Sequence, residues 1–229
     1  MENGKYIRTL RIIFSSKIRN DEIPLFRGAI LSVMKQQGDI LFHNHISDNV
    51  YNYSYPLIQY KKIRSLASIV AIEEGTEVIG QLLNKDFSSL RIGAEKRDFQ
   101  IESVIPDRIF VQVWQTEFNY RIRRWLALNS DNYLKYLSLS TLIERITLME
   151  TILKGNLLSI CKGLGIYISE ELIVKITSLS EPYLIKNKGV KIMAFDIEFA
   201  SNLSLPNFIG VGKNASIGYG IITKKQSDN

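Results

Sequence analysis

Residues 6–14 read YIRTLRIIF, and residues 23–35 read IPLFRGAILSVMK. In the first run, apolar side chains alternate along the chain, which is typical of a half-buried strand. In the second run, Pro24 suits the first turn of a helix, and apolar residues recur three or four positions apart. These helical positions are Leu25, Phe26, Ala29, Ile30 and Val33. The two stretches therefore predict a strand followed by a helix.

The rest of the first half continues this pattern of elements. Residues 50–60 and 66–72 predict two strands, and residues 74–84 predict a helix. Residues 87–114 contain two or three further strand-like runs, broken at Pro106. The order strand, helix, strand, strand, helix, strand is that of the ferredoxin-like βαββαβ unit, an α+β arrangement.

The second half repeats part of this order without repeating the sequence. Residues 118–128 predict a strand, and residues 140–162 predict a helix whose apolar positions begin at Leu142. Residues 171–178 and 190–199 are strand-like. Because no Ser/Gly-rich linker separates the halves, we expect two tandem ferredoxin-like domains packed together. The expected domains are residues 1–115 and residues 116–229.

Composition limits the kinds of chemistry that are available. The chain has 229 residues, with 29 Lys and Arg against 23 Asp and Glu, so its net charge is +6. This excess favours an acidic partner such as nucleic acid, although many basic proteins carry only a solvated surface. The single cysteine, Cys161, excludes an internal disulfide framework and a zinc site built on several thiolates. No apolar run approaches the ~18 residues of a membrane span, and the start does not resemble a signal peptide, so a cytoplasmic protein is expected.

A glycine-rich segment lies near the end of the chain. Residues 210–220 read GVGKNASIGYG, a GxGxxxxxGxG pattern. The pattern lacks the Gly-Lys-Ser/Thr ending of a Walker A loop and the spacing of a Rossmann fingerprint. Its glycines would let backbone amides approach a phosphate chain, with Lys213 adding a charge. A β-hairpin loop with glycine at its turn positions is the alternative interpretation.

The only two histidines, His43 and His45, stand two residues apart between turn signals. On an extended segment they point to the same side, with α-carbons roughly 6–7 Å apart. Such a pair can act as base and acid around one phosphate, because histidine titrates near neutral pH. Solvated loop residues are the alternative. Tyr51 and Tyr53 follow at alternate positions, where they can stack on bases or simply favour a strand.

Four motifs, in order along the chain, resemble the CRISPR repeat-processing endoribonucleases of the RAMP superfamily. They are FRGA at 26–29, LFHNH at 41–45, YPLIQYK at 55–61, and the glycine-rich segment at 210–220. The resemblance implies two ferredoxin-like folds and cleavage of a CRISPR precursor transcript within each repeat, with no metal and no cofactor. Attack by the 2′-hydroxyl on the adjacent phosphate then gives a 2′,3′-cyclic phosphate and a 5′-hydroxyl.

The resemblance also implies roles for particular residues. His43 and His45 would be the base and the acid, in an order that the sequence leaves open. Lys35 is the leading cation for the crowded phosphate, and Tyr51 or Tyr53 would orient the 2′-hydroxyl. The expected RNA contacts are Arg121, Arg123, Gly210, Gly212, Lys213, Gly218, Gly220 and Lys224. CRISPR repeat RNA is the expected partner, no membrane is expected, and other CRISPR effector subunits and a second copy of the chain are further candidate partners.

Two alternatives to the endoribonuclease remain open. One is a non-catalytic RNA-binding subunit of a CRISPR effector complex, which gives the two histidines no role. The other is an unrelated α+β enzyme that uses the glycine-rich segment to bind a nucleotide, which predicts stabilisation by a mononucleotide.

Overall fold

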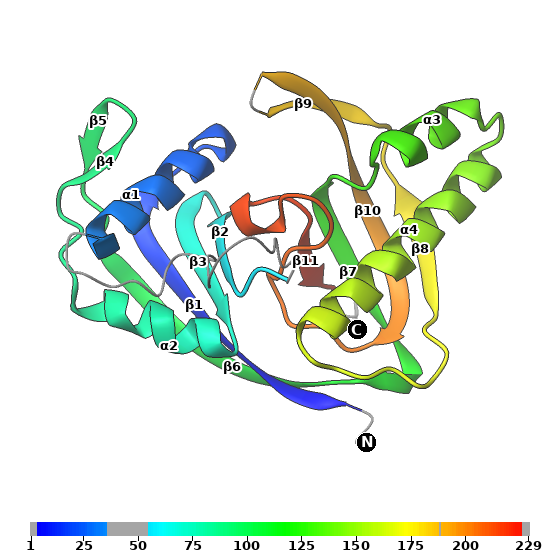
Figure 1. Cartoon of the computed structure of the whole chain (residues 1–229), viewed down its shortest axis with the longest axis horizontal. Helices are drawn as coiled ribbons and strands as arrows, with labels where there is room; N and C mark the ends of the chain where they lie inside the picture. The colour runs from blue at the N-terminus through cyan, green and yellow to red at the C-terminus, as the bar shows by residue number, and fades with distance from the viewer. Residues whose placement is uncertain (1–3, 36–54, 188, 226–229) are drawn as a thin grey trace, which may run out of the picture. The chain divides into compact units, whose positions relative to one another are not determined.

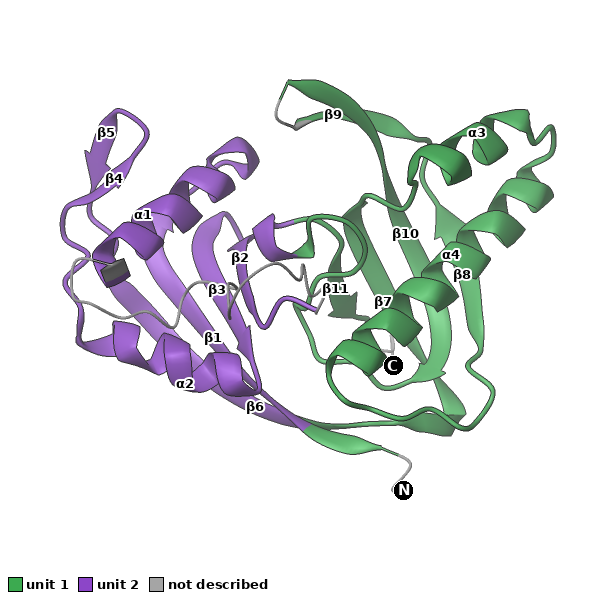
Figure 2. Cartoon of the chain, viewed as in Figure 1, with its two compact units in different colours: residues 1–6, 109–215, 219–229 green, residues 7–108, 216–218 purple. Residues whose placement is uncertain are grey.

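The computed structural model describes residues 4–35, 55–187 and 189–225, and it divides into two compact units (Figure 2). Unit 2 comprises residues 7–108 and 216–218. Unit 1 comprises residues 1–6, 109–215 and 219–229. Among the described residues, no helix combines the length and the apolar character needed to cross a membrane.

Unit 2 is a four-stranded sheet in the order β2-β3-β1-β6 (Figure 1). Both of its mapped strand pairings, β1 with β3 and β2 with β3, are antiparallel. This is the strand order of a ferredoxin-like unit, with β6 as the fourth strand. The elements are β1 (Lys5–Lys17), α1 (Ile23–Lys35), β2 (Ile58–Ile63), β3 (Leu66–Ile72), α2 (Glu74–Gly80), β4 (Leu90–Ile92), β5 (Glu95–Arg97) and β6 (Ile101–Val111). Short 3-10 turns precede α1 (Asn20–Glu22) and follow α2 (Gln81–Asn84).

The core of unit 2 lies between the sheet and its helices and is rich in aromatic rings. Phe26 of α1 stacks on Phe99 at 5.5 Å between ring centroids and meets the edge of Phe14 of β1. Sequence periodicity predicted α1 with its observed bounds. One member of its predicted apolar stripe is wrong, because Leu25 is 48% exposed while Met34 is fully buried. The buried stripe is therefore turned slightly from the predicted one.

Two details of the unit 2 sheet differ from expectation. β2 begins at Ile58 and continues through Ile63, so the predicted strand at 50–60 is wrong at 55–57 and ends too early. The reason is a two-residue turn at Arg64 and Ser65, whose φ values of 49° and 73° fit a tight hairpin that sets the register. Pro106 does not break its strand, because β6 lies at the sheet edge, where a missing N–H leaves no ladder bond unmade.

Unit 1 has a second sheet in the order β11-β7-β10-β8, with β9 paired to β10 alone. Its elements are β7 (Val113–Trp125), α3 (Ser130–Ser138), α4 (Leu142–Gly163), β8 (Val174–Leu179), β9 (Tyr183–Asn187), β10 (Val190–Leu203) and β11 (Ile221–Lys224). The strand order again matches a ferredoxin-like unit. Between β10 and β11, however, residues 204–220 form only one 3-10 turn, Ala215–Ile217, where the second helix of such a unit would stand.

The long helix α4 covers the unit 1 sheet. Thr141 and Glu144 form a capping box at its start, and Met149, Leu153 and Leu157 are fully buried. Leu142, predicted on the buried face, is instead 64% exposed, because it lies in the first turn beyond the edge of the core. The sequence pattern did not predict α3 or β9.

Candidate functional site

Most of the predicted catalytic residues lie outside the described part of the chain. These are His43, His45, Tyr51 and Tyr53. Lys35 is the last residue of α1, and its side chain is likewise not described. The structure therefore describes the helix that leads into the histidine segment and the surfaces of each unit, and the catalytic roles stay predictions.

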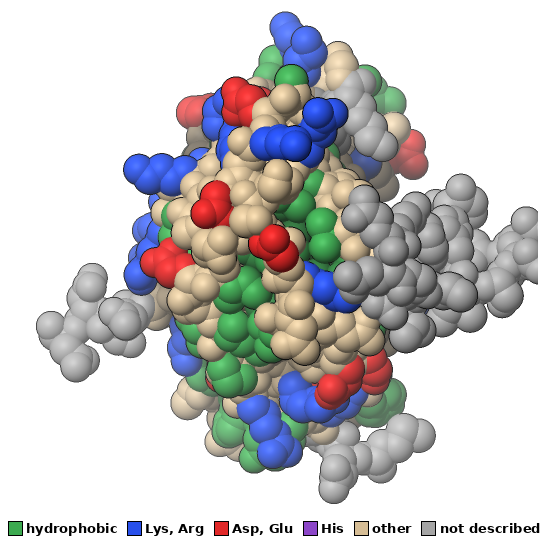
Figure 3. Space-filling view, turned by 90° about the vertical axis from the view of Figure 1, so that its left-hand side faces the viewer, with side chains coloured by type: hydrophobic (Ala, Val, Ile, Leu, Met, Phe, Trp, Pro, Cys, Tyr) green, Lys and Arg blue, Asp and Glu red, His purple; other side chains and the backbone are tan. Residues whose placement is uncertain are grey.

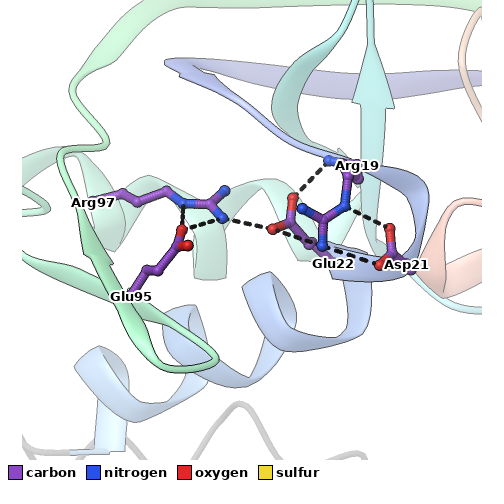
Figure 4. A network of polar contacts seen from close by, with 5 residues as sticks. All are labelled: Arg19, Asp21, Glu22, Glu95 and Arg97. Carbon is purple, nitrogen blue, oxygen red and sulfur yellow. Dashed lines mark hydrogen bonds and ion pairs between the residues drawn. The ribbon is translucent and has the colours of Figure 1, made fainter.

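The start of α1 is held by a network of charged side chains (Figure 4). The Glu22 carboxylate, only 4% exposed, accepts a hydrogen bond from Arg97 at 2.6 Å and one from the Arg19 backbone N–H at 2.8 Å. Arg97 also donates to Glu95 of β5 at 2.7 Å, and Arg19 pairs with Asp21. The bond from Arg97 lowers the pKa of Glu22. The helix that precedes the histidine segment is thus tied at its first turn to the β4–β5 hairpin.

The tip of the glycine-rich segment packs at the same end of α1. Residues 216–218 belong to unit 2, and Ile217 lies against its hydrophobic core. Gly218 has φ +83°, and a Cβ added to it would lie 2.5 Å from Cδ1 of Ile23, the first residue of α1. The positive φ favours glycine here, and an added Cβ would also require the Ile23 side chain to shift.

The remaining glycines of the segment are also required by packing within the protein. A Cβ on Gly220 (φ +61°) would lie 1.9 Å from the carbonyl oxygen of Val211, and one on Gly212 (φ +77°) would lie 2.8 Å from Nε1 of Trp125. The Gly220 N–H donates to the Arg124 carbonyl at 3.0 Å, and Gly210 bridges to Ile221. These contacts account for the four glycines as a closely packed loop. Contact of the loop with RNA stays a prediction, for which Lys213 is the exposed charge.

The two predicted arginines of β7 form ion pairs on the outer face of the unit 1 sheet. Arg121 donates to Glu198 of β10 at 2.9 Å, and Lys225 donates to the same carboxylate at 2.7 Å. These cations, Lys225 first, lower the pKa of Glu198. Arg123 reaches Asp196 at 3.2 Å and keeps 60% of its side chain exposed. Part of the positive charge is therefore neutralised, but the guanidinium of Arg123 remains available to a ligand.

Two neighbouring cations in unit 1 lie over aromatic rings. The Lys224 ammonium lies 4.8 Å from the ring centre of Phe118, and the Arg124 guanidinium lies 4.5 Å from that of Tyr219. Nη1 of Arg124 is buried, with no hydrogen-bond partner in the described ranges. Cation–π contact holds both side chains in place, and of the two only Lys224 is exposed to solvent.

Lys61 of β2 is a residue whose burial the sequence did not predict. Its side chain is fully buried, and its Nζ has no hydrogen-bond partner within the part of the chain that the structure describes. Burial lowers its pKa to about 7. Tyr60, beside it in the strand, packs on Phe26 of α1, so Lys61 points to the opposite face of the sheet. Because successive side chains of a strand face opposite sides of the sheet, the pattern along β2 could have indicated where Lys61 points. The strand, however, was predicted to end before Lys61.

The outer end of unit 2, at the left of Figure 1, carries charges of both signs. Figure 3 shows that Lys and Arg side chains there are interspersed with Asp and Glu. That face therefore offers no single basic patch of the kind that a polyanion would follow. Within the described ranges, no three His, Cys, Asp or Glu side chains come together in a way that could hold a metal ion.

Taken together, two sheets of ferredoxin-like strand order, the second closed by a glycine-rich loop, define a tandem ferredoxin-like α+β protein of the RAMP type. Comparison with protein families is more specific. The family model for the Cas6b N-terminal domain matches residues 5–108, and the model for the Cas6b C-terminal domain matches residues 112–225. The chain therefore belongs to the Cas6b family.

Among individual proteins, the chain is similar to one curated relative and to two solved Cas6b structures. A protein of Methanocaldococcus jannaschii is 37% identical over 103 residues, which is 45% of this chain and 69% of that protein. A crystal structure of Cas6b is 27% identical with a TM-score of 0.82, covering 96% of this chain and 100% of its own. A second Cas6b structure, described as a CRISPR RNA processing endoribonuclease, is 25% identical with the same coverage and a TM-score of 0.71.

Proposed function

We propose that this chain is an endoribonuclease that cleaves CRISPR precursor RNA within its repeats, without a metal ion, through attack by a 2′-hydroxyl. The observation that carries the proposal is the match of Cas6b models to both halves of a chain that holds two closely spaced histidines. The products would be a 2′,3′-cyclic phosphate and a 5′-hydroxyl.

In this proposal, His43 and His45 exchange protons at the scissile phosphate. One removes the proton of the attacking 2′-hydroxyl, and the other protonates the departing 5′-oxygen. Lys35, at the end of α1, supplies positive charge to the phosphate as its negative charge increases. Tyr51 or Tyr53 orients the 2′-hydroxyl. The network around Glu22 supports these roles indirectly, because it fixes the start of the helix that ends at Lys35.

RNA binding would use the exposed cations of unit 1. Arg123 and Lys224 are each held by a neighbour within the protein, so little side-chain entropy is lost when a phosphate binds. Lys213 adds charge on the glycine-rich segment. Assembly with other CRISPR effector subunits, or as a homodimer, stays a prediction that light scattering with and without RNA can test.

The experiment that tests the proposal is cleavage of the repeat RNA from the organism's own CRISPR array in the presence of EDTA, followed by analysis of the product ends. Cleavage at one position with a 2′,3′-cyclic phosphate is the expected result. Tight binding without cleavage would favour the non-catalytic RNA-binding subunit instead. Loss of activity in EDTA would contradict the metal-independent reaction.

The histidines are tested by His43→Ala and His45→Ala. Each change should slow single-turnover cleavage by ~10²-fold or more, because proton transfer is lost, and should leave RNA affinity nearly unchanged. Asn44→Ala, between them, is the matched control and should stay close to the parent. Equal losses of binding and cleavage in both histidine variants would argue against catalytic roles.

A further inference from the structure

We propose that the corner where α3 meets α4 binds a second copy of this chain, with the two α3 helices packed antiparallel about a two-fold axis. This corner lies wholly within unit 1, and the end of α3 leads directly into the start of α4 (Figure 1). The exposed side chains that define this apolar corner are Tyr133, Leu134, Leu137, Leu142 and Ile143.

The apolar corner gathers its exposed side chains within one short stretch, residues 133–143. Leu134 is 68% exposed, and Ile143 is 77% exposed. No other stretch of that length within the described ranges exposes as many large apolar side chains. Singly exposed apolar residues are ordinary on a monomer, whereas a group of them marks a surface that another molecule covers.

Contacts between the two helices hold the apolar corner in a fixed shape. The Arg145 guanidinium of α4 lies 5.3 Å from the ring centre of Tyr136 in α3, and it donates to the Leu139 carbonyl at 3.0 Å. Tyr136 meets the edge of Phe195 of β10 at 5.5 Å between ring centroids. A surface that is fixed before it binds loses little conformational entropy on association.

The apolar stripe of α3 does not face the core of unit 1. All nine residues of this helix are described, and Tyr136 is the one that is buried. At 3.6 residues per turn, Tyr133, Leu134 and Leu137 form one stripe whose centre lies roughly 100° around the helix from Tyr136. Packing within unit 1 therefore does not account for this stripe.

The charges beside the stripe favour a second copy as the occupant. Asp131 and Lys135 are both exposed, stand one turn apart and lie along the same flank of the stripe. An antiparallel two-fold pair brings this flank of one helix against the same flank of the other. Each Asp131 then lies beside Lys135 of the other copy, so the helix carries both halves of two ion pairs. A parallel pair would instead place this flank against the uncharged one, which bears Asn132.

The size of the apolar corner fits a reversible dimer. A standard interface takes roughly 20–30 residues from each side. The corner with its flanking charges spans residues 130–144, which is fewer. We therefore expect an association that depends on protein concentration.

The test is sedimentation velocity of the protein without RNA, over a roughly hundredfold range of concentration. The parent should pass from monomer to dimer within that range. Leu134→Glu with Ile143→Glu should raise the dissociation constant of the dimer at least about 30-fold, because each copy would bury two unpaired carboxylates. The variant should melt near the parent temperature, because both positions are exposed in the single chain.

The matched control is Leu184→Glu with Val190→Glu on the β9–β10 hairpin. Both residues are 62% exposed, and the change in net charge is the same. The control should keep the dissociation constant of the parent. If it weakens the dimer as much as the corner variant does, net charge explains the loss and the apolar corner is refuted as the interface.

The ion pairs provide a test of the antiparallel arrangement. Asp131→Lys gives each copy two cations on the charged flank, and Lys135→Asp gives each copy two anions. Each variant alone should dimerise about three- to tenfold more weakly than the parent. An equimolar mixture of the two should form a heterodimer about as tightly as the parent forms its dimer. A mixture as weak as its separate components would contradict the antiparallel pair.

Because no RNA is present, the result is independent of the proposed function. A parent that stays monomeric up to about 100 μM refutes the second copy as the occupant, and a different protein or a lipid surface would then cover the corner. A dimer that survives Leu134→Glu with Ile143→Glu unchanged refutes the corner as its interface. Repeat RNA that is bound but never cleaved refutes the proposed function and leaves the sedimentation result as it is.

Discussion

The two units of this chain have the same strand order but close their sheets in different ways. In unit 2, the helix α2 and a 3-10 turn connect β3 to the last part of the unit. In unit 1, the glycine-rich segment connects β10 to β11 instead, and its residues Val211, Ala215 and Tyr219 are buried. A loop can replace a helix here because its glycines allow backbone to pack on backbone. The glycines of residues 210–220 are therefore explained first by the fold.

The largest expected effect comes from adding a side chain at Gly220, where the backbone of the loop packs closely on itself. Gly220→Ala places a methyl group against the Val211 carbonyl at a positive φ, so the loop must move. We expect a loss of at least about 3 kcal/mol in the free energy of unfolding. The measurement is urea denaturation.

The matched substitution in the helical closure of unit 2 is Gly80→Ala. Gly80 has helical backbone angles and open space around its added Cβ. This change should stabilise by about 0.4–1 kcal/mol. If Gly220→Ala and Gly80→Ala change the free energy of unfolding by the same amount, the loop of unit 1 and the helix of unit 2 do not differ in their need for glycine.

A second contrast concerns cations on the outer faces of the two sheets. Arg121 and Arg123 of unit 1 are paired with acids, whereas the buried Nζ of Lys61 in unit 2 has no hydrogen-bond partner among the described residues. Lys61→Met should raise the free energy of unfolding by about 1–4 kcal/mol at pH 7, because it removes a polar group that burial penalises.

The stability gained from Lys61→Met should depend on pH. The pKa of Lys61 is about 7 when folded and 10.5 when unfolded, so the unfolded state binds more protons between these values. The gain should therefore be full below about pH 7 and disappear toward pH 10.5. A gain that is constant with pH would show that Lys61 is charged and solvated. The control is Lys62→Met, which removes the neighbouring, less buried lysine of the same strand.

A third comparison concerns the two acidic residues at the starts of the main helices, Glu22 before α1 and Glu144 in the first turn of α4. Glu22→Gln removes a charge-assisted bond to Arg97 and should cost about 1.5–3 kcal/mol. Because the folded pKa of Glu22 is lowered, its contribution is present above the unfolded value of 4.5 and is lost as pH falls below it. The variant should therefore lose stability less steeply in acid than the parent. Glu144→Gln, at an exposed helix cap, should lower the free energy of unfolding by less than Glu22→Gln does. A larger loss for Glu144→Gln would contradict a stabilising role for the Glu22–Arg97 bond.

The sequence predicts what depends on local pattern. The bounds of α1 and the presence of α4 follow from apolar spacing, and the order of strands follows from their alternation. The helix α3 was missed because Tyr133, Leu134 and Leu137 are exposed, which leaves it without a clear buried stripe.

Features that depend on register and on distant pairing were not predictable. The Glu22–Arg97 bond joins residues 75 positions apart, and the pairing of Lys186 with Lys191 depends on how β9 aligns with β10. The features of the candidate site likewise include some that the sequence predicts and some that it does not. The histidine pair and the glycine pattern could be identified from the sequence, whereas the ion pairs of Arg121 and Arg123 required the fold.

The placement of Ile217 has a consequence for how the protein is made. Ile217 packs on a core whose other members lie between Leu10 and Ile101, so Ile217 leaves the ribosome 116 residues after the last of those other members. At about 5–20 residues per second, this delay is roughly 6–23 s. During that time the nascent unit 2 has an unfilled place beside the first turn of α1. The core of unit 2 is thus completed by a residue that is synthesised long after its other members.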